Sequence, residues 1–100
     1  MVKKEAPQPW AVKIVGHGEE PVKGILFNPH NWRVHPRLQK EALRGAIREV
    51  GFIRSVTVNT VTGHLLDGHL RVLLADEEGQ ETVPVEYVEL TEAEELEALA

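Results

Sequence analysis

A single glycine, Gly68, constrains the fold of this 100-residue chain more than any other residue. Residues 64–67 before it are typical of a short strand, and residues 69–77 after it are typical of a helix that ends at Gly79. A strand that turns through glycine into a helix directs the free N–H groups and the positive dipole end of that helix at whatever lies in front of it. The sequence therefore predicts an anion-binding position at the start of this helix.

The side chains next to this glycine suit a phosphate ligand. His69 and Arg71 are hydrogen-bond donors, and the planar guanidinium of Arg71 matches the geometry of phosphate oxygens. A glycine also lets a ligand approach the backbone closely. A purely structural interpretation fits the same residues, because Asp67 could cap the helix while Arg71 lies on a solvated face. The chemistry alone leaves both interpretations open.

The other segments predict one small α+β domain with a mixed sheet and about three helices. Apolar residues recur with helical spacing over residues 37–50, and Gly51 stands where that helix should end. Thr91 and Glu94 form a capping box that should open a last helix. We expect extended runs at residues 10–15, 22–27, 53–59, 64–67 and 82–88, with a hairpin turn at residues 60–63. Pro84 should place the last of these runs at a sheet edge or at a bulge.

Charge is distributed unevenly along the chain, whose net charge is −5. Residues 1–71 hold all eleven basic residues and six acidic ones, whereas residues 72–100 hold ten acidic residues and no basic one. Lys40, Arg44 and Arg48 are spaced by four and therefore form one stripe along the predicted helix. We interpret this stripe either as a solvated face or as a contact for nucleic acid or a partner, and the acidic end either as solvated or as an interaction surface.

Several classes of site are excluded or disfavoured. The chain has no cysteine, which excludes disulfides, thiolate metal clusters and cysteine nucleophiles. The histidine pairs His30 and His35, and His64 and His69, lack the spacing that puts two ligands on one helix face, so we expect no metal site.

The expected domain organisation is simple. We assign residues 1–21 to a leader and the first strand, and residues 22–100 to a single domain. The last helix carries no stop signal up to Ala100, so we expect the domain to continue in a longer protein. The sequence contains no apolar stretch of the kind that forms a signal peptide or a membrane span, and we expect a cytoplasmic protein without a membrane partner.

Taken in order, these segments resemble the N-terminal domain of the ParB/sulfiredoxin superfamily over about residues 22–100. The resemblance is carried by Ile25-Leu26-Phe27-Asn28-Pro29 with Arg33, by Val50-Gly51-Phe52, by Val56-Thr57-Val58, by residues 62–71 and by Val83-Pro84-Val85. Residues 31–33 and 66–71 are most similar to ParB-like domains of phage, plasmid or other mobile-element proteins, some of them joined to DNA methyltransferases.

The resemblance implies a nucleotide-binding or phosphate-binding domain of a DNA-associated protein. The implied phosphate site consists of Gly68, His69, Leu70 and Arg71, with Arg33 approaching from the facing loop. A nucleoside triphosphate with Mg²⁺ is the implied cofactor, and its base stays open. DNA would be reached through other domains or partners, and a homodimer is one candidate for the oligomeric state.

The resemblance also leaves alternatives open, including whether the chain is an enzyme. Free-serine kinases of archaea share the Asp-Gly-His-x-Arg pattern, so a small-molecule phosphotransferase or NTPase with Asp67 as the candidate catalytic residue is one alternative. A domain without a ligand that serves as a protein-interaction surface is another. The second nucleotide motif of partition ParB proteins has no counterpart between Thr91 and residue 100, which puts a CTP switch in doubt. Gly68 stands where sulfiredoxins carry their catalytic cysteine, which excludes reduction of sulfinic acids.

Overall fold

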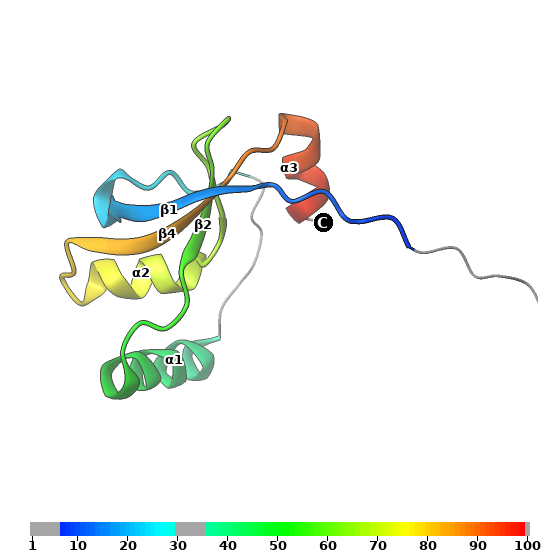
Figure 1. Ribbon diagram of the computed structural model, residues 1–100. Helices are drawn as coiled ribbons and strands as arrows, with labels where there is room; N and C mark the ends of the chain where they lie inside the picture. Colours follow the sequence, from blue (N-terminus) through cyan, green and yellow to red (C-terminus); the bar gives the residue numbers. More distant parts are fainter. Residues whose placement is uncertain (1–6, 30–35, 100) are drawn as a thin grey trace, which may run out of the picture.

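The computed structural model describes residues 7–29 and 36–99, and Figure 1 shows how they are arranged. The elements are β1 (Ile14–Pro21), a short 3-10 helix (Val22–Gly24), α1 (Arg37–Val50), β2 (Val56–Asn59), β3 (Leu65–Asp67), α2 (His69–Glu77), β4 (Thr82–Val88) and α3 (Glu92–Leu99). Within the described residues they form one four-stranded sheet with three α-helices. The predicted small α+β domain is confirmed.

The sheet is mixed, with the strand order β1-β4-β2-β3. β4 pairs antiparallel with β1 and parallel with β2, and β2 pairs antiparallel with β3 in the predicted hairpin. The segment β3-α2 is therefore the crossover between the parallel strands β2 and β4. Figure 1 shows α2 against one face of the sheet and α1 beyond α2, while α3 lies near the hairpin turn.

The hydrophobic core lies between the sheet and α2. Its buried members are Val22, Val56, Val58, Leu65, Val72, Ala75, Val83 and Val85. Leu74 of α2 is also buried. From the helical spacing over residues 69–77 we expect Leu70, Val72 and Leu73 to anchor this helix to the core, but Leu73 is 39% exposed. Val72 and Ala75, three residues apart, are the members of α2 in the core cluster against the sheet, and the 100° step from Val72 turns Leu73 away from that side. The expectation for Leu73 was wrong.

The first strand differs from the prediction. The extended run is predicted at residues 10–15, and glycines such as Gly16 and Gly18 after it are typical of a turn, but β1 begins at Ile14 and continues through both glycines. These glycines leave room for an aromatic ring, because a Cβ atom at Gly18 would lie 3.2 Å from Cε2 of Tyr87. The glycines therefore mark a close contact within the sheet and not a turn.

Three further segments also differ from the sequence prediction. The run at residues 22–27 is a 3-10 helix followed by one bridge between Leu26 and His64, and the strand expected at residues 53–59 begins only at Val56. β4 is an interior strand, although Pro84 predicted an edge or a bulge. The parallel pairing with β2 starts at Val85, so Pro84 has a strand neighbour on the β1 side alone and no ladder bond towards β2 is lost there.

Candidate functional site

Gly68 joins β3 to α2 and must be glycine for structural reasons. Its φ of 100° and ψ of 22° lie in the left-handed region, and a Cβ atom would lie 2.5 Å from Cγ1 of Val56. No side chain caps the first turn of α2, so the interpretation of Asp67 as the cap is wrong. The N–H of Val72 makes the first bond within the helix, to the carbonyl of Gly68, so the N–H groups of residues 69–71 are directed out of the helix end.

Arg71, the third residue of α2, is held in place by contacts of its side chain. Its side chain is only 15% exposed, and Nη2 donates to the carbonyl oxygen of Ser55 at 3.3 Å and to Oδ2 of Asp67 at 3.2 Å. Its Nε is buried and has no hydrogen-bond partner among the described residues. Asp67 is about half exposed and is engaged as the ion-pair partner of this arginine.

The other predicted site residues are placed differently. The side chains of His69 and Leu70 are buried. The ring of His69 packs edge to face against Phe27, with ring centroids 5.5 Å apart, so this side chain packs inside the protein and only its backbone faces the helix end. Arg33 lies outside the described residues. Of the predicted set, the structure therefore brings together Gly68, Arg71 and the amide groups between them.

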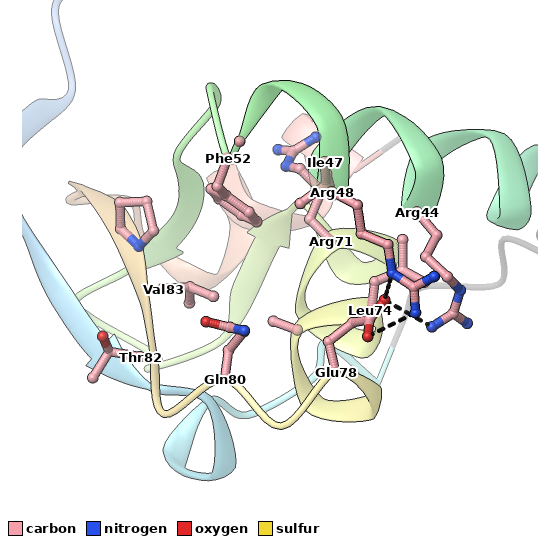
Figure 2. Close-up of a pocket in the computed structure, with 13 residues that line it drawn as sticks. Arg44, Ile47, Arg48, Phe52, Arg71, Leu74, Glu78, Gln80, Thr82 and Val83 are labelled. Atoms are coloured by element: carbon pink, nitrogen blue, oxygen red, sulfur yellow. Dashed lines mark hydrogen bonds and ion pairs between the residues drawn. The ribbon is translucent and has the colours of Figure 1, made fainter.

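A cleft of about 320 Å³ runs beside α2 and includes Arg71 (Figure 2). α1, α2 and the first half of β4 provide its walls. Its apolar part includes Ile47, Phe52 and Leu74, and its charged groups are Arg44, Arg48, Arg71 and Glu78. A space of this size is at the lower end of the range in which proteins bind small organic ligands.

The basic stripe of α1 is paired with the acidic end of α2. In Figure 2 the guanidinium groups of Arg44 and Arg48 meet the carboxylate of Glu78. Arg48 binds it through Nε at 2.7 Å and Nη2 at 3.0 Å, while Lys40 binds Glu77 at 2.9 Å. The hydrogen bond from Arg48 lowers the pKa of Glu78, and the one from Lys40 lowers the pKa of Glu77. The stripe is therefore a contact within the chain and not a simply solvated face.

These acidic partners were not predicted from the sequence, although a signal for them exists. Glu77 and Glu78 lie at the C-terminal end of α2, where the helix dipole disfavours negative charge. Two acidic residues at such a position indicate a basic partner elsewhere in the chain.

A second polar cluster, also not predicted, attaches α3 to the β2–β3 turn. Glu95 is 2% exposed and accepts hydrogen bonds from Nδ2 of Asn59 at 3.0 Å and from Oγ1 of Thr62, and its Oε2 lies 2.9 Å from Nδ1 of His64. Burial raises the pKa of Glu95, but the hydrogen bonds from His64, Thr62 and Asn59 outweigh it, and the pKa is lowered overall.

Two further observations concern the described part of the chain. No group of three or more histidine, aspartate or glutamate side chains there lies close enough together to hold a metal ion. None of the helices in residues 7–29 and 36–99 has the length and apolar character needed to cross a membrane.

No protein-family model matches the sequence, and no curated protein matches it either. Solved structures do. C-terminally truncated ParB from Caulobacter crescentus in complex with CTP-gamma-S is 28% identical with a TM-score of 0.69, and the match covers 83% of this chain and 49% of that one. A Pnob8-like ParB-N domain is 15% identical with a TM-score of 0.72, covering 88% of this chain and 36% of that one. Sulfiredoxin from Arabidopsis thaliana is 19% identical with a TM-score of 0.69, covering 86% of this chain and 99% of that one.

The three matches agree on the architecture. This chain spans about half of the Caulobacter ParB chain and about a third of the Pnob8-like ParB-N chain. It spans nearly the whole of the sulfiredoxin chain. The resemblance that the sequence indicates is confirmed at the level of the fold. The chain has a ParB/sulfiredoxin-like fold.

Proposed function

We propose that this domain binds the phosphate groups of a nucleotide and that it serves a DNA-associated protein. The observation that carries the proposal is Arg71, a mostly buried guanidinium in the first turn of α2 whose Nε has no hydrogen-bond partner among the described residues. A buried polar donor is costly when it is left unsatisfied. A phosphate in front of the helix end would accept from the N–H groups of residues 69–71, and a shift of the Arg71 side chain would bring its guanidinium, Nε included, to a phosphate oxygen.

The comparison with ParB supports the same ligand class. The Caulobacter ParB structure with this fold holds CTP-gamma-S. In our proposal Gly68, Leu70 and Arg71 contact the phosphates, the first two through their backbones, and Arg33, which lies outside the described residues, is a further proposed contact. His69 contributes its backbone, because its side chain is packed against Phe27. Mg²⁺ would accompany a triphosphate and offset its charge.

The biological context is part of the proposal. Contacts to DNA are assigned to other domains or partners, in a partition, phage or DNA-modification system, and a homodimer is the candidate oligomer.

A phosphotransferase is the second candidate function. The observation that favours it is Asp67, whose half-exposed carboxylate lies 3.2 Å from Arg71 and therefore next to the proposed phosphate position.

Calorimetric titration of ATP, ADP, CTP and GTP with magnesium tests the binding. Arg71→Ala should weaken the affinity roughly tenfold to a hundredfold, because charge-assisted hydrogen bonds to phosphate contribute on the order of 1.5–3 kcal/mol each. Arg71→Lys keeps the charge but loses the planar fork, so it should recover only part of the affinity. Thermal melting of both variants reports separately on the lost contacts to Ser55 and Asp67.

The control is Lys23→Ala. Lys23 lies beside Leu73 and Asp76, on the side of α2 that is turned away from Arg71, so its loss should leave the affinity unchanged. Equal binding to the Arg71→Ala protein would show that the phosphate site is elsewhere. Release of phosphate, or transfer of phosphate to serine, would decide for the enzyme, and Asp67→Asn should then abolish turnover.

A further inference from the structure

α1 is attached to the rest of the protein mainly through charge. None of its residues is buried, and Leu38 at its start is 84% exposed. Its contacts with α2 are ion pairs from Lys40, Arg44 and Arg48 to Glu77 and Glu78, beside the partly buried Ile47. Ion pairs at the surface contribute little to stability, about 0–1 kcal/mol each. The pair of Arg48 with Glu78 is of this kind, because the Arg48 side chain is 65% exposed, whereas the Arg44 side chain is 16% exposed. The carboxylate that holds Arg48 is therefore readily exchanged for another anion.

The charged lining of the cleft has an excess of positive groups. Arg44, Arg48 and Arg71 line the cleft with a single carboxylate, that of Glu78, while Arg44 also pairs with Glu41 and Glu77 and Arg71 with Asp67 outside the lining. Glu78 lies seven residues after Arg71 on α2, a distance of about 10 Å along the helix axis. The arginines of α1 that converge on Glu78 thus form a second cationic position at the other end of α2 from Arg71.

The carboxylate of Glu78 has the same chemistry as an anionic ligand group. Arg48 binds its two oxygens through Nε and Nη2, which is the two-point geometry by which guanidinium also binds phosphate. Arg44 approaches the same carboxylate at 3.4 Å from Nη1. A phosphate or carboxylate that entered the cleft would find both arginines already oriented.

We propose that Arg44 and Arg48 form a second anion subsite, in which Glu78 occupies the position of the ligand's anionic group while the cleft is empty of ligand. The ligand class is a phosphate compound with an apolar or aromatic body, one anionic group of which lies at Arg71 and another at Arg44 and Arg48. The inference rests on the proposed function for its phosphate position at Arg71, to which it adds a second anionic group of the ligand at the far end of the cleft. Glu78 then acts as an internal competitor that lowers the affinity for that ligand.

Titration with pyrophosphate, followed by nuclear magnetic resonance, tests the subsite separately from the proposed function. The probe signals are the Nε–H groups of Arg44 and Arg48 for the second subsite, and the backbone amides of residues 68–71 for the first. Pyrophosphate is too short to span both positions, so each set of signals reports its own site. Glu78→Gln should strengthen binding at the α1 arginines by about twofold to fivefold, the factor that corresponds to the loss of one exposed charge pair.

Glu49→Gln is the matched control, since it removes the same charge from α1 at an exposed position that does not line the cleft. Its effect should be clearly smaller than that of Glu78→Gln. Shifts at both sets of signals support both proposals. Shifts at residues 68–71 alone overturn the second subsite and support the proposed function. Shifts at Arg44 and Arg48 alone overturn the proposed phosphate site at residues 68–71 and support an anion position at the α1 arginines. No shift at Arg44 and Arg48, or equal effects of the two glutamine variants, overturns the subsite.

Discussion

At the scale of single residues, Gly68 has a structural role that precedes any role in binding. Its left-handed backbone and the close approach of Val56 exclude a Cβ atom whether or not a ligand is present. A large side chain at this position therefore damages the fold and cannot serve as a clean test of ligand approach. For that reason Arg71, whose side chain lies at the edge of the core, is the better residue for testing the site.

The structural role of Gly68 can be measured directly. Gly68→Ala should destabilise the protein by at least about 2 kcal/mol, because it combines a strained backbone with overpacking against Val56. Gly45→Ala is the matched control. Gly45 lies in the middle of α1, and apart from the backbone of its own helix no atom of the described residues lies within 4 Å of its Cβ position, so alanine should stabilise the protein by about 0.5–1 kcal/mol. Urea denaturation of both variants measures these changes, and a neutral Gly68→Ala substitution would contradict the strained turn.

At the scale of elements, the helices are attached to the sheet in three different ways. α2 buries apolar side chains against the sheet, α1 is held by ion pairs, and α3 is anchored by the buried carboxylate of Glu95. The capping box of Thr91 and Glu94 is present as predicted, with both reciprocal hydrogen bonds. The cap starts α3 locally, and the Glu95 cluster determines where this helix lies.

The anchoring of α3 should depend on pH. The pKa of Glu95 is lowered below its ordinary value of 4.5, so its contribution to stability is fully present above that value and is lost as the pH falls through the lower pKa of the folded state. Glu95→Gln should cost about 1–3 kcal/mol at neutral pH, because the buried donors of its partners lose a charged acceptor. The difference between the two proteins should shrink on acidification below pH 4.5. Chemical denaturation over a pH series measures it, and a constant difference would argue against a charged Glu95.

Elements with a local sequence signal could be predicted, and contacts between distant elements could not. α1 has the predicted bounds, because a clear helical period followed by Gly51 is a local signal. The predicted bounds of β1 were wrong, because in the sequence alone the glycines that make room for Tyr87 cannot be told from turn glycines. The pairing of α1 with Glu77 and Glu78, and the cluster around Glu95, join positions far apart in the chain. A local pattern, such as two acidic residues at the C-terminal end of a helix, can indicate that a partner exists but does not identify it.

The candidate site was predicted in part for the same physical reason. The turn at Gly68 and the position of Arg71 follow from a local strand-to-helix pattern. Whether His69 points into the site or into the core depends on Phe27, which packs against it from a distant segment. The cleft depends on how α1 lies over α2, and no property of either helix alone determines that arrangement.

At the scale of the whole molecule, the pairing of α1 with α2 reduces the positive charge that duplex DNA can meet. Lys40, Arg44 and Arg48, which form the basic stripe of α1, are paired with Glu77 and Glu78. The net charge of the chain is −5, which further opposes a polyanion. We therefore expect weak binding to duplex DNA with a shallow salt dependence, equivalent to about two or three phosphate contacts and a slope of roughly −2 to −3 in a plot of log K against log salt.

Fluorescence anisotropy with a labelled duplex at several salt concentrations measures this slope. The variant that carries both Glu77→Gln and Glu78→Gln provides the internal comparison, because it frees Lys40 and Arg48 and leaves Arg44 with Glu41 as its remaining carboxylate partner. Its slope should be steeper by about one to three contacts, since each newly available cation releases about one counterion from the duplex. Nanomolar, sequence-specific binding by the unmodified chain would mean that this domain recognises DNA itself and would overturn the assignment of DNA contacts to other domains.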